Sequence, residues 1–126
     1  MKLVLDSSII IDYLRNGQVG KSFFEEKKVD IQFFLPTIVI FELFSGKSAN
    51  NSRTVNIIED FLHYFERVTL TESIVSRAGK LYREIPRKID VSDYIIAASA
   101  LEINGTVVTL NTKHFELIPN LNIYPL

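Results

Sequence analysis

The sequence contains no cysteine and only two histidines, His63 and His114, among its 126 residues. Without cysteine the chain can form neither a disulfide framework nor a thiolate zinc site. Two histidines are too few for a histidine-rich metal cage. Any metal site must therefore be built from oxygen ligands, which favours magnesium, manganese or calcium.

Long apolar runs are also missing from the sequence. No stretch approaches the roughly 18 residues of a membrane span, and Asp6 interrupts the apolar start where a signal peptide would continue. We therefore expect a cytoplasmic protein without membrane contact. Repeats, linkers and a glycine-rich phosphate loop are absent too, and a 47% hydrophobic content predicts one globular domain over residues 1–126. The net charge of −1 neither indicates nor excludes a nucleic-acid partner.

Predicted strands alternate with predicted helices along the whole chain. Apolar runs predict strands at residues 3–5, 31–35, 67–70 and 106–110, with a further edge strand at 122–124. Helical spacing of apolar residues predicts the intervening helices, and glycines such as Gly17 and Gly46 are expected to end two of them. This alternation predicts a three-layer α/β/α sandwich with a mostly parallel central sheet of four to five strands.

Polar side chains follow two of the predicted strands directly. Asp6 comes straight after residues 3–5, and Asn111 follows residues 106–110. Because ligands gather at the carboxyl ends of parallel strands, both residues are candidates for a site. The alternative interpretation of Asp6 is a plain N-cap of the helix that starts at Ser7, and local sequence alone favours it.

Two further carboxylates lie in predicted helices. Glu42 interrupts the apolar helix 38–44, where an unpaired buried charge would cost several kcal/mol. The alternative interpretations are that Glu42 faces solvent on a polar stripe of the helix or that it pairs with a lysine. Asp90 and Asp93 begin another helix, where Asp90 is expected at the N-cap and Asp93 in the first turn. If these acids converge, they need a divalent cation, and phosphodiester hydrolysis is the chemistry that suits such a site.

The order and spacing of these motifs resemble a PIN domain of the VapC type, the ribonuclease toxins of bacterial and archaeal toxin–antitoxin pairs. The resemblance extends over nearly the whole chain. It is carried by residues 6–12 (DSSIIID), Glu42-Leu43 followed by Gly46, residues 93–100 (DYIIAASA), residues 107–111 (VVTLN), Phe115 and residues 118–119.

What the resemblance implies is a magnesium-dependent endoribonuclease, with manganese as a substitute cofactor. The three invariant acids of the family fall on Asp6, Glu42 and Asp93, which would hold the ion and act in catalysis. The fourth acidic position falls on Asn111, whose amide can still hold a metal-bound water but whose missing charge is expected to weaken metal affinity. Ser8 is expected to orient the site.

Two other acids near the motifs are expected to have a structural role. They are Asp90, which would support the site as a helix cap, and Asp12.

The resemblance also implies three partners. Relatives of this kind act on RNA, form homodimers, and are held inactive by a small antitoxin whose segment enters the cleft, often with a basic residue. Candidate RNA-backbone contacts are basic residues of one region, for which a solvated helix face is the alternative: Arg77, Lys80, Arg83, Arg87 and Lys88. Phe24, Phe41 and Phe44 would line an antitoxin groove unless they pack in the core.

Two competing hypotheses remain open at this stage. One is a non-catalytic PIN-like module that binds RNA or protein, with its metal site weakened by Asn111. The other is a phosphoacceptor of the response-regulator kind, which would require paired acids after the first strand and a lysine after the last. Asp6 stands alone and Lys113 is a poor match. Chelator-sensitive RNA cleavage would separate an enzyme from a module.

Replacing either Asp6 or Asp93 with asparagine is expected to abolish RNA cleavage and leave the fold intact. The amide keeps the size of the side chain but removes the charge that a hard cation requires. Cleavage assays and circular dichroism on the purified variants measure the two effects. Full activity of Asp6→Asn would contradict the assignment.

Overall fold

The computed structural model describes residues 1–126, apart from the side chain of Ser48. Within this described chain, five strands form one sheet in the order β3-β2-β1-β4-β5, and every neighbouring pair is parallel. The strands are β1 (Lys2–Leu5), β2 (Gln32–Pro36), β3 (Glu66–Val68), β4 (Thr106–Val108) and β5 (Asn122–Ile123). The predicted sheet is confirmed.

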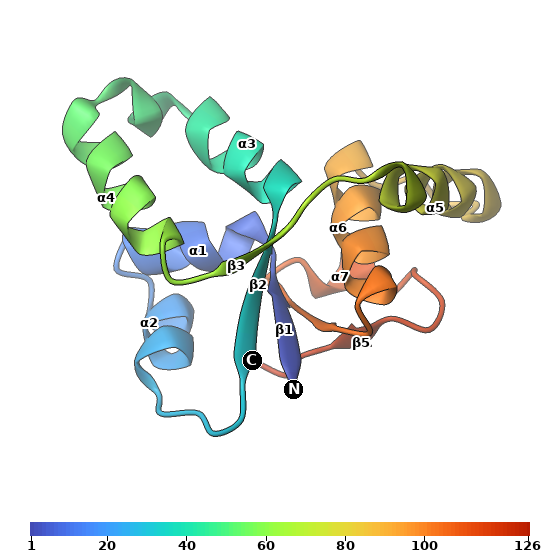
Figure 1. Ribbon diagram of the computed structural model, residues 1–126, viewed down its shortest axis with the longest axis horizontal. Helices are drawn as coiled ribbons and strands as arrows, with labels where there is room; N and C mark the ends of the chain where they lie inside the picture. Colours follow the sequence, from blue (N-terminus) through green and yellow to red (C-terminus); the bar gives the residue numbers. More distant parts are fainter.

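Helices cover both faces of the sheet, as the three-layer prediction requires. They are α1 (Ser7–Leu14), α2 (Gln18–Glu25), α3 (Thr37–Ser45), α4 (Ser52–Leu62), α5 (Glu72–Glu84), α6 (Val91–Glu102) and the one-turn α7 (Thr112–Phe115), with a 3-10 turn at Lys47–Asn50. In Figure 1, α1, α2 and α4 lie on one side of the sheet and α5 and α6 on the other, while α3 extends from the carboxyl end of β2. Of the described helices, none is both long and apolar enough to cross a membrane.

Strand β1 is the centre of the molecule. Its residues Leu3, Val4 and Leu5 are fully buried and pair with β2 on one side and β4 on the other. A strand covered on both faces must be apolar throughout, which explains its unbroken run. The Asp6 amide continues the ladder by donating to the Val108 carbonyl at 3.0 Å. Asp6 is thereby fixed at the carboxyl edge of the sheet.

Both ends of the chain lie at the opposite, amino edge of the strands. The amino group of Met1 donates to the Asp30 carbonyl at 2.7 Å. Figure 1 shows both termini toward the lower end of β1, on the side away from α3 and from the start of α6. The carboxyl edge, where Asp6 lies, is therefore free of chain ends.

The structure corrects two local predictions. Glycine does not end α1 with a left-handed residue; Asn16 takes that conformation with φ 60°, and Gly17 has an ordinary φ of −68°. Asparagine tolerates this region because its short polar side chain can bond locally. The predicted strand 106–110 ends at Val108, since the amides of Leu110 and Asn111 donate to side-chain hydroxyls instead of to a neighbouring strand.

Two glycines provide a matched test of the packing between α1 and α2. A Cβ at Gly20 of α2 would lie 2.5 Å from the Tyr13 backbone nitrogen in α1, whereas a Cβ at Gly79 of α5 meets no described atom within 4 Å. Alanine at Gly79 is expected to stabilise the protein by about 0.5–1 kcal/mol through helix propensity. Alanine at Gly20 is expected to destabilise it by about 1–3 kcal/mol, because overpacking outweighs the same gain. Urea unfolding measures both, and shifts of the same sign would contradict the close approach.

Candidate active site

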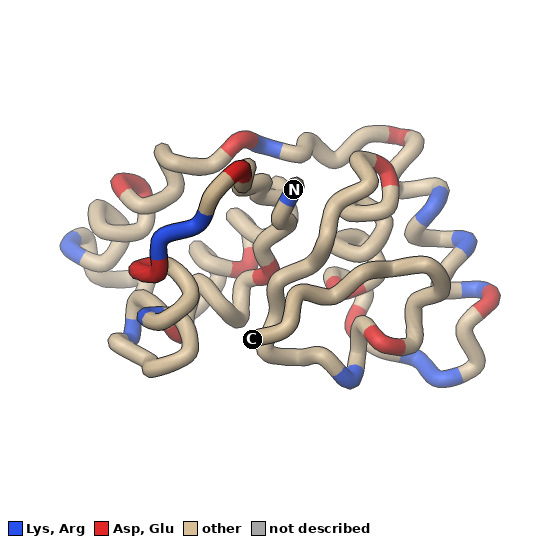
Figure 2. Tube along the Cα trace, turned by 90° about the horizontal axis from the view of Figure 1, so that it is seen from below, with Lys and Arg blue, Asp and Glu red and all other residues tan. Residues whose placement is uncertain are grey.

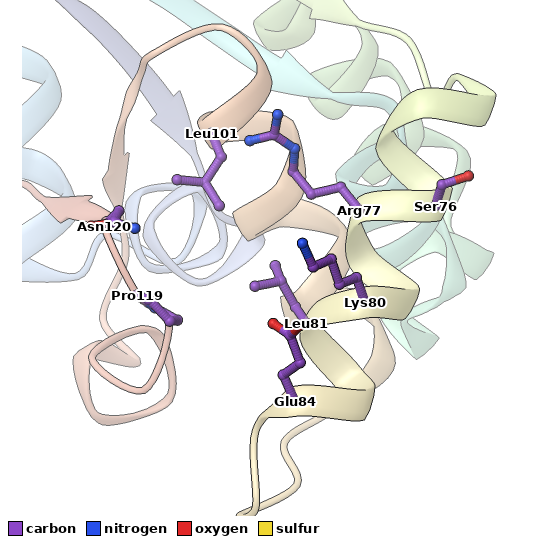
Figure 3. A pocket seen from close by; sticks show the side chains of 8 residues that line it. All are labelled: Ser76, Arg77, Lys80, Leu81, Glu84, Leu101, Pro119 and Asn120. Carbon is purple, nitrogen blue, oxygen red and sulfur yellow. The ribbon is translucent and has the colours of Figure 1, made fainter.

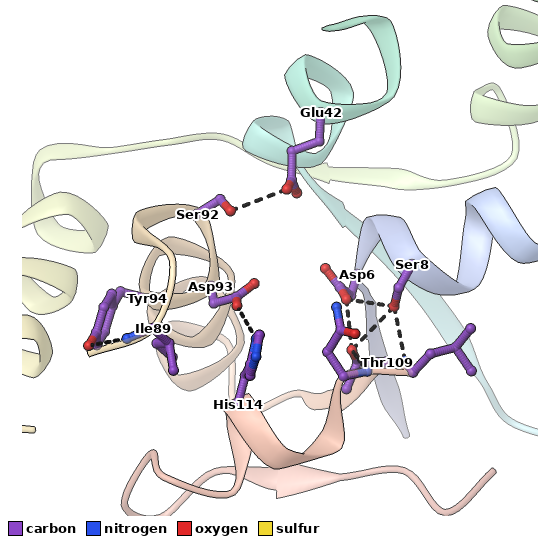
Figure 4. A network of polar contacts seen from close by, with 11 residues as sticks. Asp6, Ser8, Glu42, Ile89, Ser92, Asp93, Tyr94, Thr109 and His114 are labelled. Carbon is purple, nitrogen blue, oxygen red and sulfur yellow. Dashed lines mark hydrogen bonds and ion pairs between the residues drawn. The ribbon is translucent and has the colours of Figure 1, made fainter. Parts of the chain in front are cut away.

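Asp6 is held by two hydroxyl groups at the carboxyl edge of the sheet. Ser8 Oγ and Thr109 Oγ1 each donate to Asp6 Oδ2 at 2.7 Å. Both hydroxyls are themselves oriented, because Ser8 Oγ accepts from the Leu110 amide at 2.9 Å and Thr109 Oγ1 from the Asn111 amide at 2.9 Å. Asp6 is only 2% exposed, and Figure 4 shows its other oxygen on the side of Asp93 and Glu42.

Glu42 reaches the same region from α3. Ser92 Oγ at the start of α6 donates to Glu42 Oε2 at 3.2 Å. The second oxygen, Oε1, is buried and has no hydrogen-bond partner among the described residues. Glu42 is half-buried and turned toward Ser92, and it forms no ion pair with any lysine in the described part of the chain. A buried carboxylate oxygen without a donor is costly unless something else binds it.

Asp93 approaches from the first turn of α6. Its side chain is 8% exposed, and its Oδ2 lies 2.9 Å from His114 Nδ1 of α7. In Figure 4 the remaining oxygen of Asp93 points into the space that also receives Asp6 and Glu42. The three predicted acids thus come from β1, α3 and α6 and face one region.

The charges of these acids influence one another. Burial, followed by the negative charge of Asp6, raises the pKa of Glu42 above its ordinary value of 4.5, although the hydrogen bond from Ser92 and the nearby hydroxyl of Ser7 oppose the rise. Burial also raises the pKa of Asp93 above 3.8; the His114 hydrogen bond works against this, and the charge of Asp6 adds to it. Asp6 thus repels both other acids. Among the described residues, no three His, Cys, Asp or Glu side chains already stand as a closed metal-holding group.

The other predicted site residues take different places. Asn111 is exposed at the N-cap of α7. Its backbone N–H donates to Thr109 Oγ1, one of the two hydroxyls that hold Asp6. Ser8 donates to Asp6, the contact through which it would orient the site. Asp90 is at the N-cap of α6, but its side chain makes no capping hydrogen bond with described residues, so only its position was predicted correctly. Asp12 is structural, because its Oδ2 accepts from the Gly20 amide at 2.7 Å and joins α1 to α2.

The predicted RNA-binding residues do not form one group near the acids. Arg77 pairs with Glu102 at 3.2 Å. Glu102 ends α6, about 13 Å along the helix axis from Asp93. In Figure 3, Arg77 and Lys80 border a pocket of about 570 Å³ between α5 and the segment before β5. The pocket is lined by Ser76, Arg77, Lys80, Leu81, Glu84, Leu101, Pro119 and Asn120.

The loop after α5 carries the later basic residues and lies beside the first turn of α6. Lys88 Nζ donates to the Tyr82 carbonyl and lies 4.1 Å from the centre of the Tyr82 ring. The Ile89 amide donates to the hydroxyl of Tyr94, the neighbour of Asp93, at 3.1 Å. This loop also carries Arg87, and it packs against the first turn of α6. Figure 2 shows Lys and Arg spread along the outer side of the molecule that carries α5.

An apolar pocket of about 260 Å³ lies beside Glu42, between α1, α3 and α4. It is lined by Ile11, Leu14, Arg15, Glu42, Leu43, Gly46, Thr54, Ile57 and Ile58. Phe24 belongs elsewhere, in a core cluster where its ring centre lies 5.0 Å from that of Tyr13 and 5.3 Å from that of Phe61. Phe41 is 67% exposed, so the expectation that its helix is largely buried is wrong at that position.

Comparison with known proteins identifies the family. The family model described as PIN domain matches residues 3–120. Ribonuclease VapC19 of Mycobacterium tuberculosis is 30% identical over 125 residues, which cover 96% of this chain and 97% of the relative. The chain belongs to the PIN domain family. Within it the chain is a member of the VapC ribonucleases, toxins of VapBC toxin–antitoxin systems.

Other VapC proteins support this membership. Ribonuclease VapC1 of Methanocaldococcus jannaschii is 27% identical over 125 residues, which cover 97% of this chain and 85% of the relative. The solved structure of VapBC2 from Rickettsia felis, bound to a DNA fragment from their promoter, contains a chain that superposes with a TM-score of 0.86 at 25% identity and 98% coverage of both chains. The phosphoacceptor hypothesis is therefore wrong.

Three residues that contact the candidate acids were missed by sequence reasoning. Thr109 and Ser92 donate to Asp6 and Glu42, and His114 binds Asp93. Thr109 could have been found because it follows β4, the strand that pairs with β1, and its hydroxyl can therefore reach Asp6 at the end of β1. His114 lies three residues after Asn111, one helical turn further on, which was the signal for its proximity to the site.

Replacing Glu42 with glutamine is expected to stabilise the metal-free protein at pH 7. Because the folded pKa values of Glu42 and Asp93 are raised, the folded state binds protons more readily than the unfolded chain. The free energy of unfolding therefore falls as the pH rises through the window above 4.5, and it recovers on acidification. Urea unfolding of both proteins is expected to show an advantage of Glu42→Gln at pH 7 that shrinks toward pH 4.5. An advantage that grows on acidification would contradict the raised pKa.

Proposed function

We propose that this VapC ribonuclease is a magnesium-dependent endoribonuclease that hydrolyses RNA phosphodiester bonds at Asp6, Glu42 and Asp93. The observation that carries the proposal is the buried Glu42 Oε1, which has no hydrogen-bond partner among the described residues and lies in a region shared with two other carboxylates. Manganese is expected to substitute for magnesium, since both prefer oxygen ligands.

The residues present fit a hard divalent cation. Asp6, Glu42 and Asp93 offer oxygen only, and each of the latter two is repelled by the charge of Asp6. A cation would offset that repulsion, and magnesium keeps several waters when few carboxylates bind it directly, which suits an open group of acids. Asn111 would serve as the fourth ligand, through a water. A bound ion would orient and acidify a water and stabilise negative charge on the phosphate.

The chain's own residues would do the remaining work. Ser8 and Thr109 occupy one oxygen of Asp6 and so fix the direction of the other. Ser92 fixes Glu42 in the same way. One of these carboxylates, Glu42 or Asp93, would accept the proton of the attacking water. Arg83, Arg87 and Lys88 would contact the RNA backbone near the acids, whereas Arg77 and Lys80 would do so only at the far end of α6.

The partners of this PIN domain are proposed on its likeness to VapC proteins and on the pocket beside Glu42. We expect a small antitoxin to place apolar side chains in the pocket between α1, α3 and α4. A basic side chain at the end of that segment would face the Glu42 carboxylate, which borders the pocket. Phe41 is exposed one residue before Glu42 and would extend the contact. A homodimer is expected from the family resemblance.

Cleavage of RNA by the purified chain is expected to require Mg²⁺, to stop on addition of EDTA, and to resume with excess Mn²⁺. Asn111→Asp is expected to restore the fourth charge and lower the metal concentration for half-maximal cleavage. Asn56→Asp, a change of the same chemistry on the exposed face of α4, should leave that concentration unchanged.

Two outcomes would contradict the proposal. Cleavage that survives both EDTA and Asp6→Asn would place the activity elsewhere or in a contaminant. RNA binding without cleavage at any metal concentration would favour the non-catalytic module, and recovery of cleavage in Asn111→Asp alone would identify the missing charge as the reason.

A further inference from the structure

His114 occupies a defined position beside Asp93, although it lies on a helix of only one turn. Its neighbour Phe115 is fully buried, and the Ile118 amide donates to the Phe115 carbonyl at 3.1 Å. The His114 amide donates to the Asn111 carbonyl at 3.0 Å. Buried packing and backbone bonds therefore anchor α7, and the ring of His114 is directed across to α6, as Figure 4 shows.

The contact of His114 with Asp93 resembles the contacts that hold Asp6. Nδ1 lies 2.9 Å from Asp93 Oδ2, and because an ionised carboxylate only accepts hydrogen bonds, Nδ1 must carry the hydrogen. Asp6 has two hydroxyl donors on one oxygen, whereas His114 is the one side-chain donor found for Asp93 among the described residues. The result is the same for both acids, because one oxygen is occupied and the other faces the shared region.

We propose that His114 is a positioning residue that holds the Asp93 carboxylate in the orientation needed to bind the divalent cation. This inference rests on the proposed function and deepens it. Without the Nδ1–H donor, the carboxylate of Asp93 is free to rotate about its last bond, and binding a cation must then order it. Donors that orient a metal-binding carboxylate in this way typically contribute 10- to 100-fold to metal affinity, by rough measure.

The competing interpretation is a contact that only joins α7 to α6. The two interpretations differ in what they predict for affinity. A purely structural contact would lower the stability of His114 variants in proportion to the packing lost, and it would leave cation affinity unchanged in variants that fold. A positioning contact lowers cation affinity and is rescued by any side chain that returns a donor to the same point.

The test is Mn²⁺ affinity, measured by the electron paramagnetic resonance signal of free Mn²⁺ at fixed pH. His114→Leu removes the donor and keeps comparable bulk, whereas His114→Asn places an amide N–H close to the original Nδ1. His63→Leu is the matched control, since His63 is exposed at the end of α4. We expect the Mn²⁺ dissociation constant to rise about 10- to 100-fold in His114→Leu, and by less than about tenfold in His114→Asn. The control should match the wild type.

The results separate the failure of this inference from the failure of the proposed function. Unchanged Mn²⁺ affinity in a folded His114→Leu, or equal loss in His114→Asn, overturns the role of His114 alone. A wild-type chain that binds no Mn²⁺, or an Asp6→Asn variant that binds it as tightly as the wild type, overturns the metal site and this inference with it. If His114→Leu does not fold, the comparison of His114→Asn with the wild type decides. A loss of Mn²⁺ affinity of more than about tenfold in His114→Asn would show that a returned donor does not rescue binding, and it would overturn the role of His114. In the cleavage assay, saturating Mn²⁺ is expected to restore the rate of His114→Leu.

Discussion

Mutual repulsion among three partly buried carboxylates is the constraint that the rest of the structure satisfies. Burial raises the pKa of both Glu42 and Asp93, and the negative charge of Asp6 raises both further. A fold that brings like charges together needs a rigid frame, because each acid gains by moving away. The frame is the fully buried strand β1 with its two parallel neighbours, and helices α3 and α6 are fixed against it.

Each acid is held by a donor that comes from a distant part of the chain. Thr109 lies 103 residues from Asp6, Ser92 lies 50 residues from Glu42, and His114 lies 21 residues from Asp93. The donors occupy one oxygen of each acid and leave the other for the shared region. Glu42 shows the limit of this arrangement, since its free oxygen is buried and finds no partner among described residues. Order in the site is thus achieved before any cation binds.

Two of the three acids could be predicted because each violates a local rule, whereas Asp93 obeys one and was assigned from the family resemblance. Asp6 interrupts an apolar run, and Glu42 lies in a helix that is otherwise apolar. Their donors could not be predicted in this way, because a threonine in a strand or a histidine in a polar turn violates nothing, and its partner is fixed only by the tertiary fold. The sheet followed from alternating patterns, but its edges did not: Asn16 replaced Gly17 at the left-handed position, and β4 stopped early because side chains captured its amides. The choice between core and groove for Phe24 and Phe41 was left open for a similar reason, since nothing local separates a core aromatic from an exposed one.

The placement of the chain ends has a practical consequence. The amino group of Met1 is tied to Asp30, and both termini lie at the edge of the sheet remote from Asp6. A passenger sequence fused to either end would therefore extend away from the acids and leave their opening accessible.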